Sequence, residues 1–128
     1  MKEIKYPTVE EALYLHSILI ERFGGGAAVL DLGLLESALS RPRSGYYRTL
    51  SEQAAALLHS LAKNHPFQDG NKRMALALTA TFLLINGYRL DSPVDGTVQF
   101  IEDVANGKID TVALIAEWLE RYIHAVKS

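Results

Sequence analysis

The sequence of 128 residues predicts an all-α fold: a bundle of about six helices around a central apolar helix, with at most short extended segments. Two observations support this fold class. Apolar residues recur at helical spacing between clusters of glycine, proline and capping residues. No long stretch alternates between apolar and polar residues, as a half-buried strand would. Repeats, low-complexity tracts and linkers are also absent, so we expect residues 1–128 to form a single domain.

The first helix is predicted from Thr8 and Glu11, which have the spacing of a capping box. The glycines at positions 24–26 would end it. Between these signals, apolar residues recur every three or four positions, and they are Leu15, Ile18, Leu19 and Phe23.

A short second helix is predicted over residues 32–39, with Asp31 near its start. Arg41 and Pro42 follow and break the helical pattern. Residues 41–50 then form a connecting segment that we expect to be partly extended.

The third and fourth predicted helices flank a short polar stretch. Ser51 is the predicted N-cap of the third helix, which is rich in alanine and leucine and ends near Asn64. The fourth helix runs from about Asn71 to Asn86, with Gly87 just after its end. Because it is apolar nearly all round, we expect it to be the central helix. Its apolar residues are Met74, Ala75, Leu76, Ala77, Leu78, Ala80, Phe82, Leu83, Leu84 and Ile85.

The last third of the chain predicts a short extended piece and two more helices. Residues 88–91 are the candidate extended piece. Ser92 as N-cap and Pro93 as first helical residue predict a fifth helix that ends near residues 106–107. Asp110 is the predicted N-cap of the sixth helix. The apolar stripe of this helix consists of Val112, Ile115, Leu119 and Ile123.

Composition excludes several functional classes. The net charge of −2 does not fit a helix-turn-helix domain with a basic stripe, or binding to an anionic membrane. The absence of cysteine excludes disulfides and thiolate metal sites and fits a reducing compartment. The longest apolar run, residues 74–85, is shorter than the span of about 20 residues that a membrane requires. The first residues lack the apolar core of a signal peptide. We expect a cytoplasmic protein that binds neither membrane nor nucleic acid.

The stretch HPFQDGNKR, residues 65–73, lies between the third and fourth predicted helices. Pro66 disfavours helix at His65, and Phe67 is expected to point inward as an anchor. Gly70 permits a tight turn and the close approach of a ligand. The first N–H groups of the next helix lack intrahelical partners and carry the positive end of its dipole. The loop and the helix start therefore form a candidate phosphate site.

Polar side chains of the same stretch add chemistry to this site. His65 can accept a proton near neutral pH. Asp69 suits Mg²⁺, which binds through one or two carboxylates plus substrate phosphates. Asn71 offers an amide donor, and Lys72 and Arg73 offer positive charge. Together these groups match the requirements of phosphoryl or nucleotidyl transfer.

Simpler interpretations of the stretch remain open. Each residue taken singly is more often structural, as a helix cap or a solvated charge. The loop could also bind an anion without catalysis. A zinc site at His65 and Asp69 would need at least one further ligand that the spacing does not supply. The combination of all these groups at one helix start favours the catalytic interpretation.

The stretch resembles the signature of the Fic/Doc family, H-P-F-x-D/E-G-N-G/K-R, at every defined position. The segments LLESALSRP and NGYRLDSP, together with the short length, resemble the Doc branch, the death-on-curing toxins. The resemblance implies a Fic/Doc-type helical bundle. Members that transfer AMP usually carry glycine where this sequence has Lys72. Doc-type proteins carry lysine there and act as kinases, although Gly70 is typical of the AMP-transferring members.

The resemblance also implies an activity and a role for each motif residue. The activity is transfer of the terminal phosphate of ATP to a threonine of elongation factor Tu, which arrests translation; AMP transfer is the alternative. His65 would accept the proton of the attacking hydroxyl, and Asp69 would hold Mg²⁺. Asn71 and the backbone around Gly70 would cradle a phosphate. The charge of the moving phosphoryl group would be neutralised by Lys72 and Arg73.

Regulation and target alignment are implied by the resemblance as well. Many Fic proteins inhibit themselves through an [S/T]-x-x-x-E-[G/N] helix, but this sequence contains no Glu-Gly or Glu-Asn pair. Doc-type toxins are instead restrained by a separate antitoxin whose disordered tail folds on the toxin. Residues 41–48, with three arginines and two tyrosines, could be the flap that aligns the target, or a solvated basic loop with its tyrosines on the core.

Side chains outside the motif are interpreted as structural. We expect His59 to be a core or surface histidine and Trp118 to be a core residue. His16 and His124 show no pattern that suggests a partner.

Overall fold

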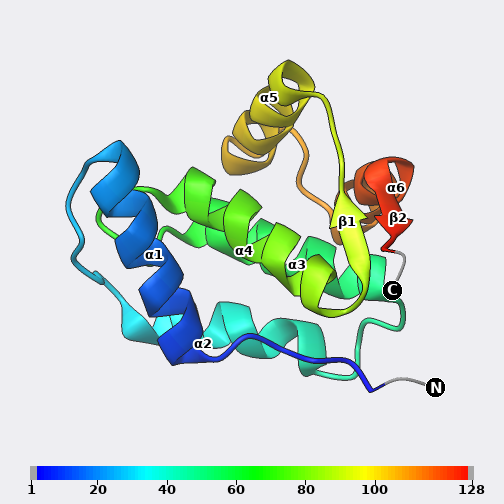
Figure 1. Cartoon of the computed structure of the whole chain (residues 1–128), viewed down its shortest axis with the longest axis horizontal. Coiled ribbons are helices and arrows are strands. Elements are labelled where there is room, and N and C mark those ends of the chain that lie inside the picture. The colour runs from blue at the N-terminus through cyan, green and yellow to red at the C-terminus, as the bar shows by residue number, and fades with distance from the viewer. Residues whose placement is uncertain (1–2, 127–128) are drawn as a thin grey trace.

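The computed structural model describes residues 3–126 and confirms the all-α prediction (Figure 1). A one-turn 3₁₀ helix, η1 (Arg41–Arg43), and two short strands, β1 (Tyr88–Leu90) and β2 (Ile123–Ala125), accompany the α-helices of this part of the chain. The α-helices are α1 (Val9–Phe23), α2 (Leu32–Ser40), α3 (Leu50–Asn64), α4 (Asn71–Ile85), α5 (Val94–Ala105) and α6 (Val112–Tyr122).

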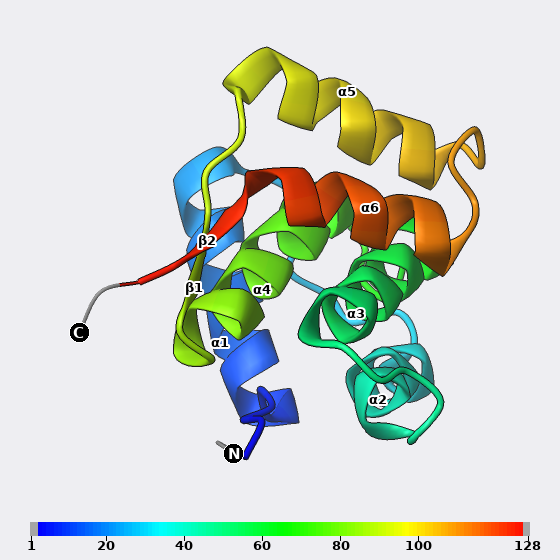
Figure 2. The ribbon, with the colours of Figure 1, turned by 90° about the vertical axis from the view of Figure 1, so that its right-hand side faces the viewer.

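The central helix is α3, whereas the sequence pattern had favoured α4. Ten residues of α3 are buried, against six of α4. Helices α2, α4 and α6 lie around α3 (Figure 2), and α5 also packs against it. Alanines 54–56 of α3 are fully buried, and their small side chains let neighbouring helices approach from several sides. In α4, Leu84 and Ile85 at the end of the helix remain 52% and 41% exposed.

The predicted caps are confirmed for the first two helices and wrong for the third. Thr8 and Glu11 form the reciprocal bonds of a capping box, and Asp31 accepts from the Leu34 N–H. The third helix is capped by Thr49, whose side chain forms a second capping box with Glu52. The predicted cap, Ser51, lies inside the first turn and is buried.

The predicted N-caps of the last two helices are wrong as well, and each lies one residue before the actual cap. Pro93 is the N-cap of α5, and the Ser92 hydroxyl bonds to that of Thr97 instead. Thr111 caps α6 and accepts from the Leu114 N–H at 3.2 Å. Asp110 lies outside the helix, where its carboxylate has two basic partners on α3.

A strand forms within the predicted residues 88–91, whereas residues 41–50 form no strand, although Thr49 has an extended backbone. Strand β1 pairs antiparallel with β2, with Leu90 opposite Ile123. The sequence pattern had assigned Ile123 to the last helix, because strand pairing across 33 residues leaves no local signal. The segment 41–50 begins with η1, and Arg41 donates to the Tyr47 and Ser60 hydroxyls.

The described helices include none that is both long and apolar enough to cross a membrane.

The contacts of Asp110 predict a pH-dependent contribution to stability. Hydrogen bonds from His59 at 2.9 Å and Lys63 at 3.0 Å lower the pKa of the Asp110 carboxyl. A carboxyl whose pKa is lowered by folding stabilises the protein above its unfolded pKa, and this contribution is lost as pH falls through the folded pKa. We expect Asp110→Asn to lower the melting temperature at about pH 7, and the difference from wild type to shrink below about pH 4.

The matched control is Glu120→Gln, which removes a charge from the exposed surface of α6, the helix that follows Asp110. It should change the melting temperature little at either pH. A deficit of Asp110→Asn that stayed constant with pH would contradict the proposed cause.

Candidate active site

The loop between α3 and α4 presents His65 at the surface. Helix α3 ends at Asn64, and His65 takes a left-handed conformation with φ 50° and ψ 61°. This region costs an L-residue about 1–2 kcal/mol, and Pro66 disfavours the α-helical alternative. The chain therefore turns sharply, and the His65 side chain is exposed beside the start of α4.

The loop is anchored by Phe67, as predicted. Its ring is 1% exposed and stacks on the His16 ring of α1, with a centroid distance of 3.7 Å and an interplanar angle of 11°. The Asn71 side chain accepts from the Phe67 N–H at 3.1 Å and donates to the Phe67 carbonyl at 2.9 Å. The amide expected to donate to phosphate is therefore engaged with the loop itself. At the first position of α4, the Asn71 backbone N–H lacks an intrahelical acceptor.

The segment after α1 runs alongside the loop. The Gln68 N–H donates to the Ala28 carbonyl, and the Leu30 N–H donates to the Pro66 carbonyl, both at 2.9 Å. A Cβ atom at Gly25, where φ is 107°, would lie 2.9 Å from the Asp69 Cβ, so this glycine permits the close approach of the two segments.

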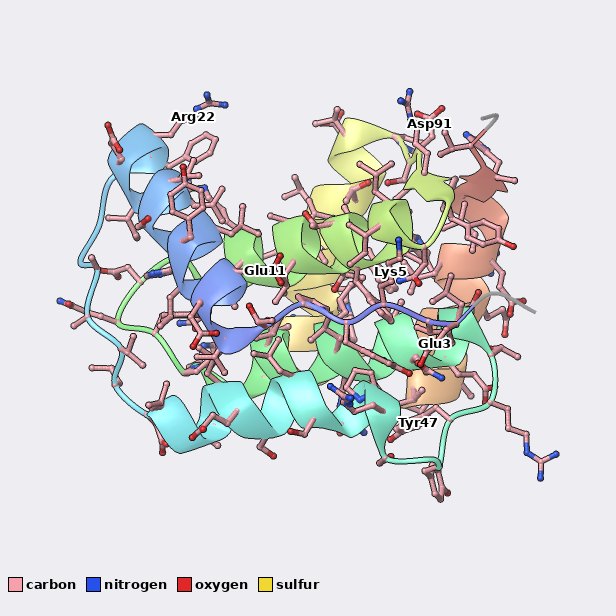
Figure 3. The ribbon with its side chains drawn as sticks, turned by 60° about the horizontal axis from the view of Figure 1, so that its bottom comes forward. Glu3, Lys5, Glu11, Arg22, Tyr47 and Asp91 are labelled. Atoms are coloured by element: carbon pink, nitrogen blue, oxygen red, sulfur yellow. The ribbon has the colours of Figure 1, made fainter. Side chains whose placement is uncertain are left out.

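The position of residues 41–48 in the structure argues against the interpretation that they form a flap over the site. Tyr47 lies at the opposite end of the molecule from Arg22, which is at the end of α1 near the loop (Figure 3). Arg41 packs on α3, and Arg43 lies over the Tyr6 ring. The alternative was a solvated basic loop whose tyrosines pack on the core. Tyr46 is 82% exposed, so this alternative is wrong for Tyr46.

A pocket of about 520 Å³ opens beside the loop. One wall is the loop with the first turns of α4, and the other is α5. The volume lies in the usual range for small-molecule sites. The lining residues are His65, Gln68, Asp69, Gly70, Asn71, Lys72, Arg73, Leu76, Val98, Ile101 and Glu102. The structure thus brings all the predicted site residues to one cavity.

The start of α4 has the features of an anion site. Gly70 is the N-cap with φ 80°, and it offers no side chain to the free N–H groups of the first turn. That turn carries Lys72 and Arg73 and no acidic residue. Each cation has a partner from another helix. The Lys72 ammonium lies 2.7 Å from Glu102 of α5, and the Arg73 guanidinium lies 4.6 Å from the centre of the Phe23 ring of α1.

Asp69 is the candidate metal ligand. One carboxylate oxygen accepts from the Gly26 N–H at 2.7 Å, and the side chain lines the pocket. Within residues 3–126 no group of three or more histidine, cysteine or acidic side chains could hold a metal ion, which removes the support for zinc. A single carboxylate beside an anion site fits Mg²⁺ shared with substrate phosphates.

His16 is the site residue that sequence reasoning missed. It is 2% exposed, and its Nε2 lies 2.8 Å from the Asp69 carbonyl oxygen. A signal was present, because His16 follows Ala12 by four positions on the buried face of α1. His59 bonds to Arg41 and Asp110, and Trp118 is partly buried against the core and stacks on Phe100. His124, for which the sequence suggested no partner, lies 3.5 Å from the Asp91 carboxylate.

Comparison with known proteins identifies the family. The sequence model of the Fic/DOC family matches residues 6–83, which include the whole loop and most of α4. The chain belongs to the Fic/DOC family. A similar Fic/DOC relative is Toxin Doc of Mycolicibacterium smegmatis, 44% identical over 74% of this chain and 78% of the relative. Protein kinase doc of Escherichia phage P1 is 35% identical over 92% of this chain and 95% of the relative.

The Lys72–Glu102 contact in this Fic/DOC chain predicts that Glu102 competes with an anion for Lys72. Both side chains are about half exposed, at 48% and 47%. Such a pair is worth at most about 1 kcal/mol, or about fivefold in a dissociation constant. We expect Glu102→Gln to bind inorganic phosphate and ATP up to about fivefold more tightly in titration calorimetry.

The matched control is Glu117→Gln, which removes a charge from an exposed ion pair with Arg121 on α6. It should leave both affinities unchanged. An unchanged or weaker affinity of Glu102→Gln would show that Glu102 does not compete with the ligand.

Proposed function

We propose that this Fic/DOC protein is the toxin of a toxin–antitoxin module and a protein kinase. Its reaction would transfer the terminal phosphate of ATP to a threonine hydroxyl of elongation factor Tu, with Mg²⁺ as cofactor, and would arrest translation. The observation that carries the proposal is the motif loop with Lys72 at the start of α4, in one pocket with His65 and Asp69. The names of the two relatives, a toxin and a protein kinase, support it.

The proposed reaction assigns a role to each motif residue. His65 takes the proton of the attacking hydroxyl as its oxygen bonds to the terminal phosphorus. The bond from that phosphorus to the bridging oxygen breaks, and the nucleoside diphosphate leaves. Lys72 and Arg73 neutralise charge on the phosphates, together with the free N–H groups at the start of α4. Asp69 would hold Mg²⁺, which supplies further charge neutralisation when bound.

The pocket and the loop are suited to these roles. His65 is exposed and sits on a loop held by the buried Phe67, so its position is fixed while its imidazole remains accessible. Leu76, Val98 and Ile101 give the pocket an apolar side on which the nucleoside could lie.

Regulation by a separate protein completes the proposal. The sequence lacks the glutamate motif with which many Fic proteins inhibit themselves. We propose an antitoxin with a disordered tail that folds on this protein. The site of action would be the cytoplasm.

Changing His65 to alanine tests the chemistry. With ATP labelled at the terminal phosphate, the wild-type protein should label elongation factor Tu, and His65→Ala should be slower by about 100- to 10,000-fold. The variant should also lose toxicity to its host and keep its melting temperature, because Phe67 and Asn71 still hold the loop.

The control is His124→Ala, which removes an exposed histidine from β2 and should keep full activity. Label transferred only from the α-phosphate of ATP would replace the kinase by an AMP transferase. If His65→Ala still arrested growth as the wild type does, toxicity would not require catalysis, and the protein would act as a binding module.

Changing Asp69 to asparagine tests the metal site. Asparagine keeps an oxygen that can accept from the Gly26 N–H, so the loop should stay in place. Mg²⁺ should strengthen ATP binding to the wild-type protein in calorimetry, and the variant should lose about tenfold or more of that affinity, because a charged ligand is missing. Equal effects of Mg²⁺ on both proteins would refute the role of Asp69.

A further inference from the structure

We infer that His16 is a positioning residue for Asp69, which it holds through the Asp69 backbone carbonyl from beneath the loop. The inference rests on the proposed function for the role of the Asp69 carboxylate. Among residues 3–126, His16 is the buried histidine, and the proposed reaction does not use it.

The geometry makes His16 the donor of this contact. Its Nε2 lies 2.8 Å from the Asp69 carbonyl oxygen, which can only accept. Nε2 must therefore carry a hydrogen, which excludes the tautomer whose only N–H is at Nδ1. The stack on Phe67, with an interplanar angle of 11°, fixes the plane of the ring. Stack and hydrogen bond together leave the imidazole little freedom.

Two contacts hold Asp69 from different sides. His16 binds its carbonyl, and the Gly26 N–H binds its carboxylate at 2.7 Å. The tip of His16 also lies below the N-cap of α4, since a Cβ added to Gly70 would be 3.7 Å from Nε2. A single buried ring on α1 thus supports the candidate metal ligand and lies close to the N-cap of α4. Partners that hydrogen-bond a metal-ligating side chain commonly change metal affinity about 10- to 100-fold when replaced, and we expect a contact to the backbone of the ligand residue to act in the same direction.

Two variants separate the hydrogen bond from the packing. His16→Phe keeps a flat ring against Phe67 but removes the donor, whereas His16→Gln keeps an N–H donor and loses the ring. If the hydrogen bond positions Asp69, His16→Phe should weaken the binding of ATP with Mg²⁺ by about tenfold or more. Its binding of ATP without Mg²⁺ should change little. His16→Gln should restore much of the Mg²⁺-dependent affinity, even though it packs less well.

If His16 only packs, the two variants should show the opposite order of affinity for ATP with Mg²⁺. His16→Phe, the better packed variant, would then bind ATP with Mg²⁺ as well as the wild type does, and this result would overturn the inference. Equal losses in both variants would also overturn it, because retention of the donor would make no difference.

Measurements on the loop itself keep the inference separate from the proposed function. Nitrogen NMR of the wild-type imidazole should show the Nε2–H tautomer, and the Nδ1–H tautomer would overturn the inference even if no variant folded. Amide exchange of residues 67–71 should be faster in His16→Phe than in His16→Gln. If the wild-type protein binds ATP equally with and without Mg²⁺, the proposed function fails, while these two measurements still report whether His16 holds the loop.

Discussion

The candidate active site depends on the burial of one aromatic ring, that of Phe67. Its stack on His16 ties the loop to α1, and the paired hydrogen bonds of Asn71 tie the same residue to the start of α4. Burying a phenylalanine side chain contributes about 1.5–3 kcal/mol, which is enough to offset the cost of about 1–2 kcal/mol of the left-handed backbone at His65. The exposed groups of the loop are therefore positioned by a contact that never meets the ligand.

The charged groups of the site come from the loop and α4, and each is held by a different kind of contact with another segment. Lys72 meets a carboxylate of α5, Arg73 lies over an aromatic ring of α1, and Asp69 accepts from a backbone N–H after α1. The exposed ion pair is weak, so a phosphate can displace it at small cost. The contacts of the buried Phe67 hold the loop in place beneath these groups. The site therefore has a fixed scaffold, and its cations remain available to a ligand.

Local signals in the sequence predicted most elements but misplaced their starts. The capping box of α1 is strictly local and was read correctly. At the third and sixth helices, Ser51 and Asp110 were chosen over neighbouring threonines, because all these residue types can cap. Tertiary contacts decided between them: Ser51 is buried against the core, and Asp110 is engaged by His59 and Lys63. The sequence pattern favoured α4 as the central helix because α4 has more large apolar residues. The central helix is α3, whose small alanines are buried and allow close packing.

The sequence by itself determined the helical class, the motif loop and its family resemblance, since periodicity, caps and a nine-residue motif are all local. It also predicted that Phe67 would face inward. Only the tertiary structure decided which groups from distant segments complete the site: Glu102, Phe23, Gly26 and His16. It also decided that Asn71 braces the loop with its side chain. These contacts join residues that are up to 53 positions apart, and packing of whole helices, rather than any local pattern, brings them together.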